Sequence, residues 1–341
     1  MNTKELTSAE LQTSNSELTT SDGCRLSRVP CNPKLACPVC RAVLSATDED
    51  NQLCPSCGFA LCSIGGVWRG LPKDRMDFYI SFIRDYETIR RAEGRGSADA
   101  QSYLALPFRD LSGQLDWQWK IRGASYRHLE AYIWPELERL YPQGLDLLDI
   151  GAGNCWLSYR VALRGHRPAA VDLILNEWDG LGAARHYLAV LKRPFPRFQA
   201  EMDRLPFANA QFDVVVFNAS LHYSVNYFVT LGEALRCLRP QGHLLVMDSP
   251  IYRADESGQR MLHERHCQFE KQYGFRSDTV PSMEYLTYGM IRNLADHFGL
   301  EWEILRPWYG LQWWLRPIKA KLRRRREPGK FHILWLKRIT A

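Results

Sequence analysis

The chain has 341 residues, of which 45% are hydrophobic and 24% charged, so its length suits about two folded domains with a buried core. It contains no apolar run of about 18 residues and its first twenty residues are polar, so we expect a cytoplasmic protein without a transmembrane segment. The net charge of +6 is concentrated in residues 316–326, which hold seven basic residues and no acid, so the rest of the chain is close to neutral.

The N-terminal part of the chain is rich in cysteine. Residues 1–30 lack hydrophobic periodicity and are predicted to be a disordered tail. Seven of the ten cysteines fall between Cys24 and Cys62. Because the cytosol keeps thiols reduced, this cluster indicates metal binding rather than disulfides. Residues 31–72, with short apolar pieces between Cys, Pro and Gly, are therefore predicted to be a zinc ribbon.

Four of these cysteines form two C-x-x-C pairs separated by thirteen residues: Cys37, Cys40, Cys54 and Cys57. Two such pairs complete a closed tetrahedral Zn²⁺ site, which suits a structural or recognition role because no ligand position is left open. Four unrelated reduced cysteines and a redox C-x-x-C are the alternatives, and no β-α-β pattern supports the latter. Cys24, Cys31 and Cys62 are interpreted as bystanders.

Two helical patterns follow the ribbon. Apolar residues recur at helical spacing over residues 74–93 and again over residues 126–140. We assign residues 73–114 to a helical linker and residues 115–341 to one catalytic domain.

Strands and helices then alternate to the end of the chain. Strands are predicted at 145–150, 169–171, 212–217, 243–247, 301–305 and 331–336, and helices at 180–191, 230–238, 255–272 and 284–298. The runs at 212–217 and 243–247 are almost wholly apolar, as in parallel strands buried on both faces. This order predicts a doubly wound, Rossmann-like α/β fold.

A glycine-containing turn follows the first of these strands. The segment Asp149-Ile150-Gly151-Ala152-Gly153 stands where glycines allow a ligand to approach the backbone at the carboxyl edge of the sheet. Asp172, about twenty residues later, ends the second strand and is placed to hold ribose hydroxyls. Trp156 replaces the third glycine of the dinucleotide fingerprint, which favours a nucleotide without a pyrophosphate over NAD.

The same region carries four motifs in order: residues 149–155, Leu205-Pro206-Phe207, residues 212–218 and residues 235–242. Together they resemble the class I methyltransferases that use S-adenosylmethionine (SAM), of the kind known as methyltransferase type 11, over residues 115–250. The cysteine segment, with residues 66–72 after it, is similar to zinc ribbons ahead of some bacterial methyltransferases, including enzymes that act on a guanine of ribosomal RNA.

The resemblance implies a set of SAM-binding residues: Asp149, Gly151, Ala152, Gly153, Asp172, Asp203 and Asn218. Gly151 and Gly153 would line the methionine part, and Asp172 would hold the ribose. Asp203 would meet the adenine amino group, with Glu201 as the alternative. Asn218 would lie beside the methionine moiety.

Three residues near the ends of the later strands are candidates for contact with the methyl acceptor. His222 is a candidate general base if the acceptor must lose a proton, and a locally hydrogen-bonded histidine is the alternative. Asp248 and Tyr252 follow the next strand and are candidate acceptor contacts. Residues 253–298 are a candidate acceptor-binding cap.

The basic stretch at residues 316–326 admits three interpretations: a solvated helix and loop, a phosphate-binding element or a contact with an anionic membrane. The favoured function is methyl transfer from SAM to a small or lipid-like acceptor. The alternatives are an RNA base methyltransferase and a non-catalytic zinc-ribbon adaptor that binds SAM. No oligomeric state follows from the sequence.

Overall fold

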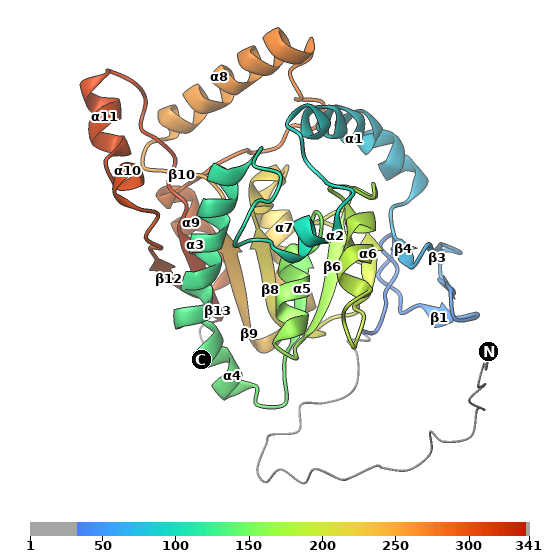
Figure 1. Ribbon diagram of the computed structural model, residues 1–341. Coiled ribbons are helices and arrows are strands. Elements are labelled where there is room, and N and C mark those ends of the chain that lie inside the picture. Colours follow the sequence, from blue (N-terminus) through green and yellow to red (C-terminus); the bar gives the residue numbers. More distant parts are fainter. Residues whose placement is uncertain (1–32, 339–341) are drawn as a thin grey trace, which may run out of the picture.

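A central β-sheet runs through residues 33–338, the part of the chain that the computed structural model describes (Figure 1). The tail expected over residues 1–30 lies outside these residues. The sheet has eleven strands in the order β1-β2-β3-β4-β7-β6-β5-β8-β9-β13-β12. Their bounds are Ser45–Ala46 (β1), Asn51–Leu53 (β2), Ala60–Ile64 (β3), Val67–Arg69 (β4), Asp146–Ile150 (β5), Arg167–Asp172 (β6), Arg197–Gln199 (β7), Phe212–Asn218 (β8), Leu238–Met247 (β9), Leu300–Leu305 (β12) and Ile333–Arg338 (β13).

The middle of this sheet confirms the predicted Rossmann-like α/β fold. Strands β7, β6, β5, β8 and β9 are parallel, and β13 is inserted antiparallel between β9 and β12. Every residue of β8 is buried, because its Val and Phe side chains meet a hydrophobic layer on each face. The parallel strands place all their carboxyl ends at one edge, where a ligand site is expected.

Helices cover both faces of the sheet (Figure 1). One face packs against α2 (Ala100–Leu104), α3 (Asp116–Tyr132), α4 (Trp134–Leu140), α5 (Trp156–Leu163), the short helix η1 (Leu181–Ala184) and α6 (Arg185–Leu188). The other face packs against α7 (Tyr227–Cys237) and α9 (Tyr288–Phe298). The remaining helices are α1 (Lys73–Ala92), η2 (Leu221–Tyr223), α8 (Asp255–Tyr273), α10 (Leu311–Trp314) and α11 (Arg316–Leu322).

The cysteine-containing segment is continuous with the main sheet. Its last strand, β4, pairs in parallel with β7, so that Val67 lies opposite Arg197. A further bridge joins Leu35 to Phe207, in the loop that follows β7. The ribbon therefore extends the edge of the Rossmann-like sheet by hydrogen bonding.

Two expected helices differ from those observed. The pattern over residues 126–140 is divided between α3 and α4, because Pro135 begins a new helix in its first turn. The pattern over residues 284–298 gives only α9, since Leu286–Thr287 forms the short strand β11, which pairs with β10 (Ile251–Tyr252). Within the candidate cap at residues 253–298, α8 crosses above the sheet edge in Figure 1, whereas α9 packs in the core. Among residues 33–338, no helix is both long and apolar enough to span a bilayer.

Phe207 tests the junction between ribbon and sheet. Its ring is fully buried and lies edge-on to Phe198 and Phe212, with ring centroids 4.8 and 5.0 Å away. Phe207→Ala should lower the free energy of unfolding by about 3–5 kcal/mol, because it leaves a cavity between the two parts. Urea unfolding of the full chain measures this. Phe228→Ala, at a ring that is 45% exposed, is the matched control and should lower the free energy of unfolding by less than about 1 kcal/mol. Equal decreases for the two variants would contradict a packing role for Phe207 at the junction.

Candidate functional site

Two adjoining cavities open at the carboxyl edge of the parallel strands. The first holds about 1060 Å³ of empty space, counting the solvent at its mouth, and the second about 680 Å³. They share five lining residues: Arg90, Arg95, Arg122, Ala219 and Tyr223. Volumes of this size suit a cofactor beside a small molecule.

The turn after β5 forms the floor of the first cavity. Gly151 has φ +73°, and a Cβ there would lie 2.2 Å from the Cβ of Ser220, so only glycine fits. Gly153, at φ +54°, also adopts the left-handed conformation that glycine tolerates best. Cys155, two residues after Gly153, adopts φ +66° and is buried. Ala152 lies between the two glycines on the cavity wall.

Asp172 links two loops at this turn. Its carboxylate accepts hydrogen bonds from the backbone N–H groups of Gly153 and Ile174, each at 2.8 Å. Burial raises the pKa of Asp172 to about 6, and these two hydrogen bonds oppose that shift. Asp172 lines the first cavity, at the end of β6 where the sequence predicted a ribose-binding acid.

Asp149 occupies a different place. It is fully buried and does not line either cavity; one carboxylate oxygen accepts a hydrogen bond from the Ser158 hydroxyl on α5 at 2.8 Å. The other oxygen has no hydrogen-bond partner among the described residues. Burial raises the pKa of Asp149 to about 7. Its hydrogen bond to Ser158 links the end of β5 to α5, on either side of the glycine turn.

Glu201 and Asp203, the two acids that the sequence left as alternatives for contact with the adenine, lie in the loop after β7 but have different surroundings. Asp203 lines the first cavity and accepts a hydrogen bond from the Thr230 hydroxyl. Glu201 is buried against the Arg75 guanidinium, with oxygen-to-nitrogen distances of 2.7–3.1 Å, and does not line the cavity. Of the two acids, only Asp203 lines the cavity.

Asn218 ends β8 and lines the first cavity. Its side-chain oxygen is buried and has no hydrogen-bond partner among residues 33–338. A buried amide oxygen without a partner is costly, which is typical of a group that a ligand satisfies. The next residue, Ala219, turns the chain with φ +55° and also borders the second cavity.

Helix α1 forms the wall opposite the strands. Tyr79, Phe82, Tyr86 and Arg90 recur at helical spacing and all line the first cavity. The rings of Phe82 and Tyr86 also contact Tyr223 on η2, with centroids 6.2 and 6.1 Å away. The sequence identified the apolar face of this helix but assigned it to a linker. That face covers the site.

Asp248 and His222 line the second cavity. One oxygen of Asp248 accepts a hydrogen bond from the Ser125 hydroxyl at 2.5 Å, and the other is buried without a partner among the described residues. Burial raises the pKa of Asp248, whereas burial and the Arg265, Arg90 and Arg122 charges lower that of His222 to about 3. His222 is therefore neutral at physiological pH, whereas burial favours the protonated form of Asp248.

Three arginines that the sequence analysis did not single out stand between the two cavities. Arg90 and Arg95 share the carboxylate of Glu93, each at 2.8 Å. Arg122, on α3, lies over the Trp119 ring at 4.8 Å, and no hydrogen bond or ion pair links it to another described residue. Burial lowers the pKa of Arg122. Only the tertiary fold brings these residues together, because they come from different helices and loops.

Tyr252 does not line either cavity. It is buried in β10, edge-on to the Tyr285 ring at 5.8 Å, and its hydroxyl accepts a long hydrogen bond of 3.4 Å from Arg326. Of the residues predicted to contact SAM or the methyl acceptor, all except Tyr252 and Asp149 line one of the two cavities.

The four ribbon cysteines form one cluster. The sulfur atoms of Cys37, Cys40, Cys54 and Cys57 all lie within 4.8 Å of one another. Cys37 and Cys57 are 3.5 Å apart and Cys40 and Cys54 are 3.4 Å apart, sulfur to sulfur. Zn–S bonds of about 2.3 Å give a tetrahedron with edges of about 3.8 Å, so the donor set fits one Zn²⁺ ion.

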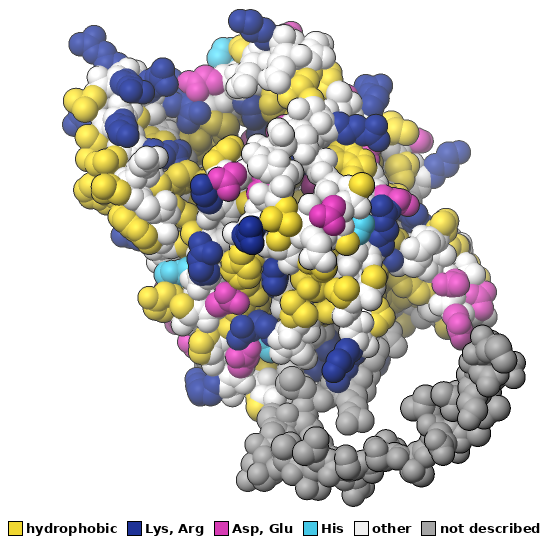
Figure 2. Space-filling view, in the orientation of Figure 1, with side chains coloured by type: hydrophobic (Ala, Val, Ile, Leu, Met, Phe, Trp, Pro, Cys, Tyr) yellow, Lys and Arg dark blue, Asp and Glu magenta, His cyan; other side chains and the backbone are white. Residues whose placement is uncertain are grey.

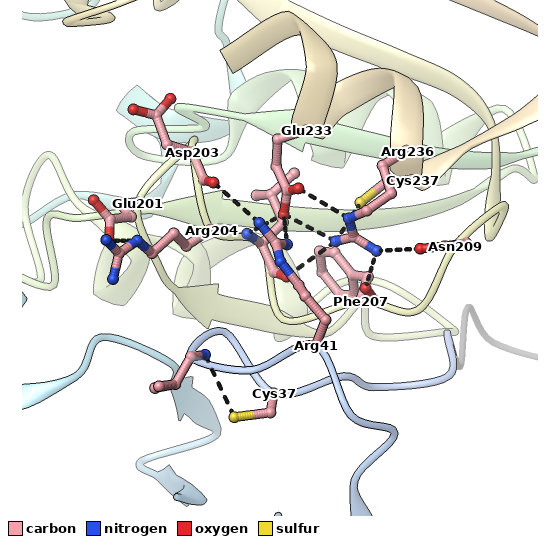
Figure 3. A network of polar contacts seen from close by, with 12 residues as sticks. Cys37, Arg41, Glu201, Asp203, Arg204, Phe207, Asn209, Glu233, Arg236 and Cys237 are labelled. Carbon is pink, nitrogen blue, oxygen red and sulfur yellow. Dashed lines mark hydrogen bonds and ion pairs between the residues drawn. The ribbon is translucent and has the colours of Figure 1, made fainter. Parts of the chain in front are cut away.

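The ribbon contacts the Asp203 loop through Arg41, which follows Cys40 (Figure 3). Arg41 forms an ion pair with Glu233 of α7 and donates a 3.4 Å hydrogen bond to the backbone oxygen of Asp203. Glu233 in turn accepts the backbone N–H of Leu205 at 2.7 Å and pairs with Arg236. One buried carboxylate, that of Glu233, thus joins the cysteine ribbon to the loop that carries Asp203.

The central part of the chain matches a family model. Residues 148–246 match the family described as "Methyltransferase domain". A demethylmenaquinone methyltransferase of Mycobacterium sp. (strain JLS) is 31% identical over 113 residues, which are 33% of this chain and 45% of that protein. A fatty-acid O-methyltransferase of Mycolicibacterium smegmatis is 31% identical over 144 residues, 42% of this chain and 51% of that protein. The chain therefore spans about half the length of these relatives.

Among solved structures, the chain is similar to the 1,6-didemethyltoxoflavin-N1-methyltransferase of Burkholderia thailandensis, solved with bound 1,6-didemethyltoxoflavin and S-adenosylhomocysteine. The TM-score is 0.44 at 14% identity, covering 87% of this chain and 99% of that one.

The burial of Asp149 predicts how the stability of the protein changes with pH. Its pKa is raised from 3.8 to about 7, so protonation favours the folded state: stability is greatest at low pH and falls as the pH rises through 7. In Asp149→Asn this dependence is absent. The free energy of unfolding of the variant, relative to the wild type, should therefore rise between pH 5 and pH 8, as measured by urea unfolding without cofactor. Asp77→Asn, at an exposed position of α1, is the control; a pH-independent difference for Asp149→Asn would contradict the burial argument.

Proposed function

We propose that this protein transfers a methyl group from SAM to a small or lipid-like acceptor, because residues 148–246 match the family described as "Methyltransferase domain". The observation that carries the proposal is the pair of adjoining cavities at the carboxyl ends of β5, β6, β8 and β9. The first has the residues expected for SAM, and the second provides room for an acceptor next to Ala219.

Each wall of the first cavity has a role in the proposed binding of SAM. Gly151, Ala152 and Gly153 allow close approach of the methionine part, and Asn218 offers its unpaired oxygen beside it. Asp172 would accept the ribose hydroxyls, and Asp203 the adenine amino group. When bound, SAM supplies an electrophilic methyl group, so the protein mainly aligns the acceptor atom with it.

Asp248 is the proposed proton acceptor if the acceptor atom carries a proton. Its buried, unpaired oxygen borders the second cavity, and burial raises the pKa of Asp248 whereas it lowers that of His222. His222, kept neutral, would donate or accept a hydrogen bond. Arg122, whose charge also acts on the carboxylates of Asp248 and Asp179, would attract an electron-rich acceptor group.

The acceptor class is inferred from the relatives and from the cavity. The two curated relatives are described as acting on demethylmenaquinone and on fatty acids. The second cavity of this chain has apolar walls at Trp117, Ile121, Pro250 and Phe331, which would accommodate an apolar ring or chain. RNA and a non-catalytic, SAM-binding role are the alternatives that the following experiment distinguishes.

The purified full chain should transfer label from methyl-labelled SAM to a component of its host extract. Label in the organic-soluble fraction supports the proposal, whereas nuclease-sensitive label would replace it with an RNA acceptor. Binding of SAM without turnover in any fraction would favour the adaptor role. Asp172→Asn should bind SAM roughly 10- to 100-fold more weakly, because it loses charged hydrogen bonds, and should transfer correspondingly less label.

A structural Zn²⁺ in the ribbon is proposed to support cofactor binding through Arg41. Arg41→Ala should raise the Kd for SAM roughly 3- to 30-fold, because Glu233 loses one charged partner and the Asp203 loop loosens. Isothermal titration with SAM measures this, and thermal unfolding separates it from loss of the fold. Arg84→Ala, an exposed arginine on α1, is the control. If zinc removal by a chelator and Arg41→Ala both leave the Kd unchanged, the ribbon has no part in SAM binding.

A further inference from the structure

Helices α10 and α11 carry an exposed apolar stripe. Leu311, Trp314, Ile318 and Leu322 are spaced by three, four and four residues and are 62%, 58%, 49% and 80% exposed. Leu315, between the two helices, keeps a right-handed helical backbone, so the four side chains follow one face. Figure 2 shows hydrophobic side chains gathered on the side of the molecule where Figure 1 places these helices. A continuous apolar patch of this kind marks an interaction surface.

Basic side chains surround this stripe. A hollow between α8 and α11 is lined mainly by basic residues: Arg260, Arg316, Lys319 and the four arginines at 323–326. The one acid in its lining is Glu264. Glu264 pairs with Arg326 at 2.6 Å. The other basic side chains around the hollow form no ion pair with a described residue, so their charge would attract an anionic partner.

The combination of the two features distinguishes between anionic partners. Nucleic acid would contact the basic side chains but would leave exposed Leu and Ile side chains in water, since its bases stack on aromatic rings instead. A bilayer with anionic headgroups satisfies both features: Leu and Trp side chains enter the interface while Lys and Arg side chains meet the headgroup phosphates. Trp308, 66% exposed just before α10, has the residue type that is enriched at membrane interfaces.

The opposite side of the same segment reaches the acceptor cavity. Trp313 packs on Phe331, with ring centroids 5.5 Å apart, and Phe331 lines the second cavity. Tyr309, 5.2 Å from Trp313, shares the Ser125 hydroxyl with Asp248. Contact of α10 with a surface would therefore bring that surface close to the cavity wall.

We propose that α10 and α11 dock the protein on an anionic lipid surface, with Leu311, Trp314, Ile318 and Leu322 inserted among the headgroups. The docking itself does not depend on the proposed function. One consequence does rest on it: a lipid-like acceptor held in the bilayer would reach the second cavity without crossing water.

Sedimentation of the full chain with vesicles tests the docking, without SAM or any acceptor. The protein should sediment with phosphatidylcholine vesicles that contain phosphatidylglycerol, and less with phosphatidylcholine alone. Binding should weaken as salt is raised. The double variant Leu311→Ser/Leu322→Ser and the triple variant Arg323→Glu/Arg324→Glu/Arg325→Glu should each lower the partition coefficient roughly ten-fold or more.

The matched control is Leu140→Ser/Leu163→Ser, at exposed leucines of α4 and α5. It should bind vesicles as the wild type does, and circular dichroism should show all three variants folded. Failure of the wild type to bind anionic vesicles would overturn the proposal. So would binding of a single-stranded RNA that the triple variant abolishes while vesicles are ignored, or self-association that the double variant abolishes without any vesicle binding. Vesicle binding with no methyl transfer in any extract would leave the docking intact and refute the proposed function alone.

Discussion

The parallel pairing of β4 with β7 makes the cysteine ribbon and the Rossmann-like strands one continuous sheet. Strand β7 would otherwise present free backbone N–H and C=O groups at the edge of the sheet, and the ribbon covers it. The pairing also brings Arg41 to Glu233, whose carboxylate holds the loop before Phe207. Glu233 is buried and binds both Arg41 of the ribbon and the backbone of the loop, so the position of the ribbon and the position of that loop depend on each other.

The remainder of the site follows from this arrangement. The chain leaves β4 and enters α1, so the ribbon also determines where that helix crosses the carboxyl edge of the sheet. Helix α1 can then supply an aromatic wall from Tyr79 to Tyr86, opposite Asp172 and Asn218. A segment that connects two parts of the chain thus encloses the cavity, which would exclude water from a bound cofactor.

Charge is distributed unevenly around the two cavities. The strand ends provide carboxylates, at Asp172 and Asp203, where the first cavity has the residues expected for a nucleoside and a cationic sulfur. Arginines from α1 and α3 stand at the boundary with the second cavity, and further basic residues surround the exposed face of α11. Three acids, Asp172, Asp179 and Asp203, thus line the first cavity, whereas Asp248 is the one acid that lines the second.

Local sequence determined the elements and the ligand sets whose members are close along the chain. Apolar runs predicted β5, β8 and β9, because strands buried on both faces need continuous Val, Leu and Phe. Two C-x-x-C pairs predicted the cysteine cluster, because each pair meets one ion from a single turn. The choice between Glu201 and Asp203, the covering role of α1 and the position of Arg122 between the cavities came only from the tertiary structure. Each of these depends on contacts between residues that are far apart in the sequence. Glu201 does not line the cavity because it binds Arg75. Helices α1 and α3 lie over the strand ends because of long-range packing, which no local pattern encodes.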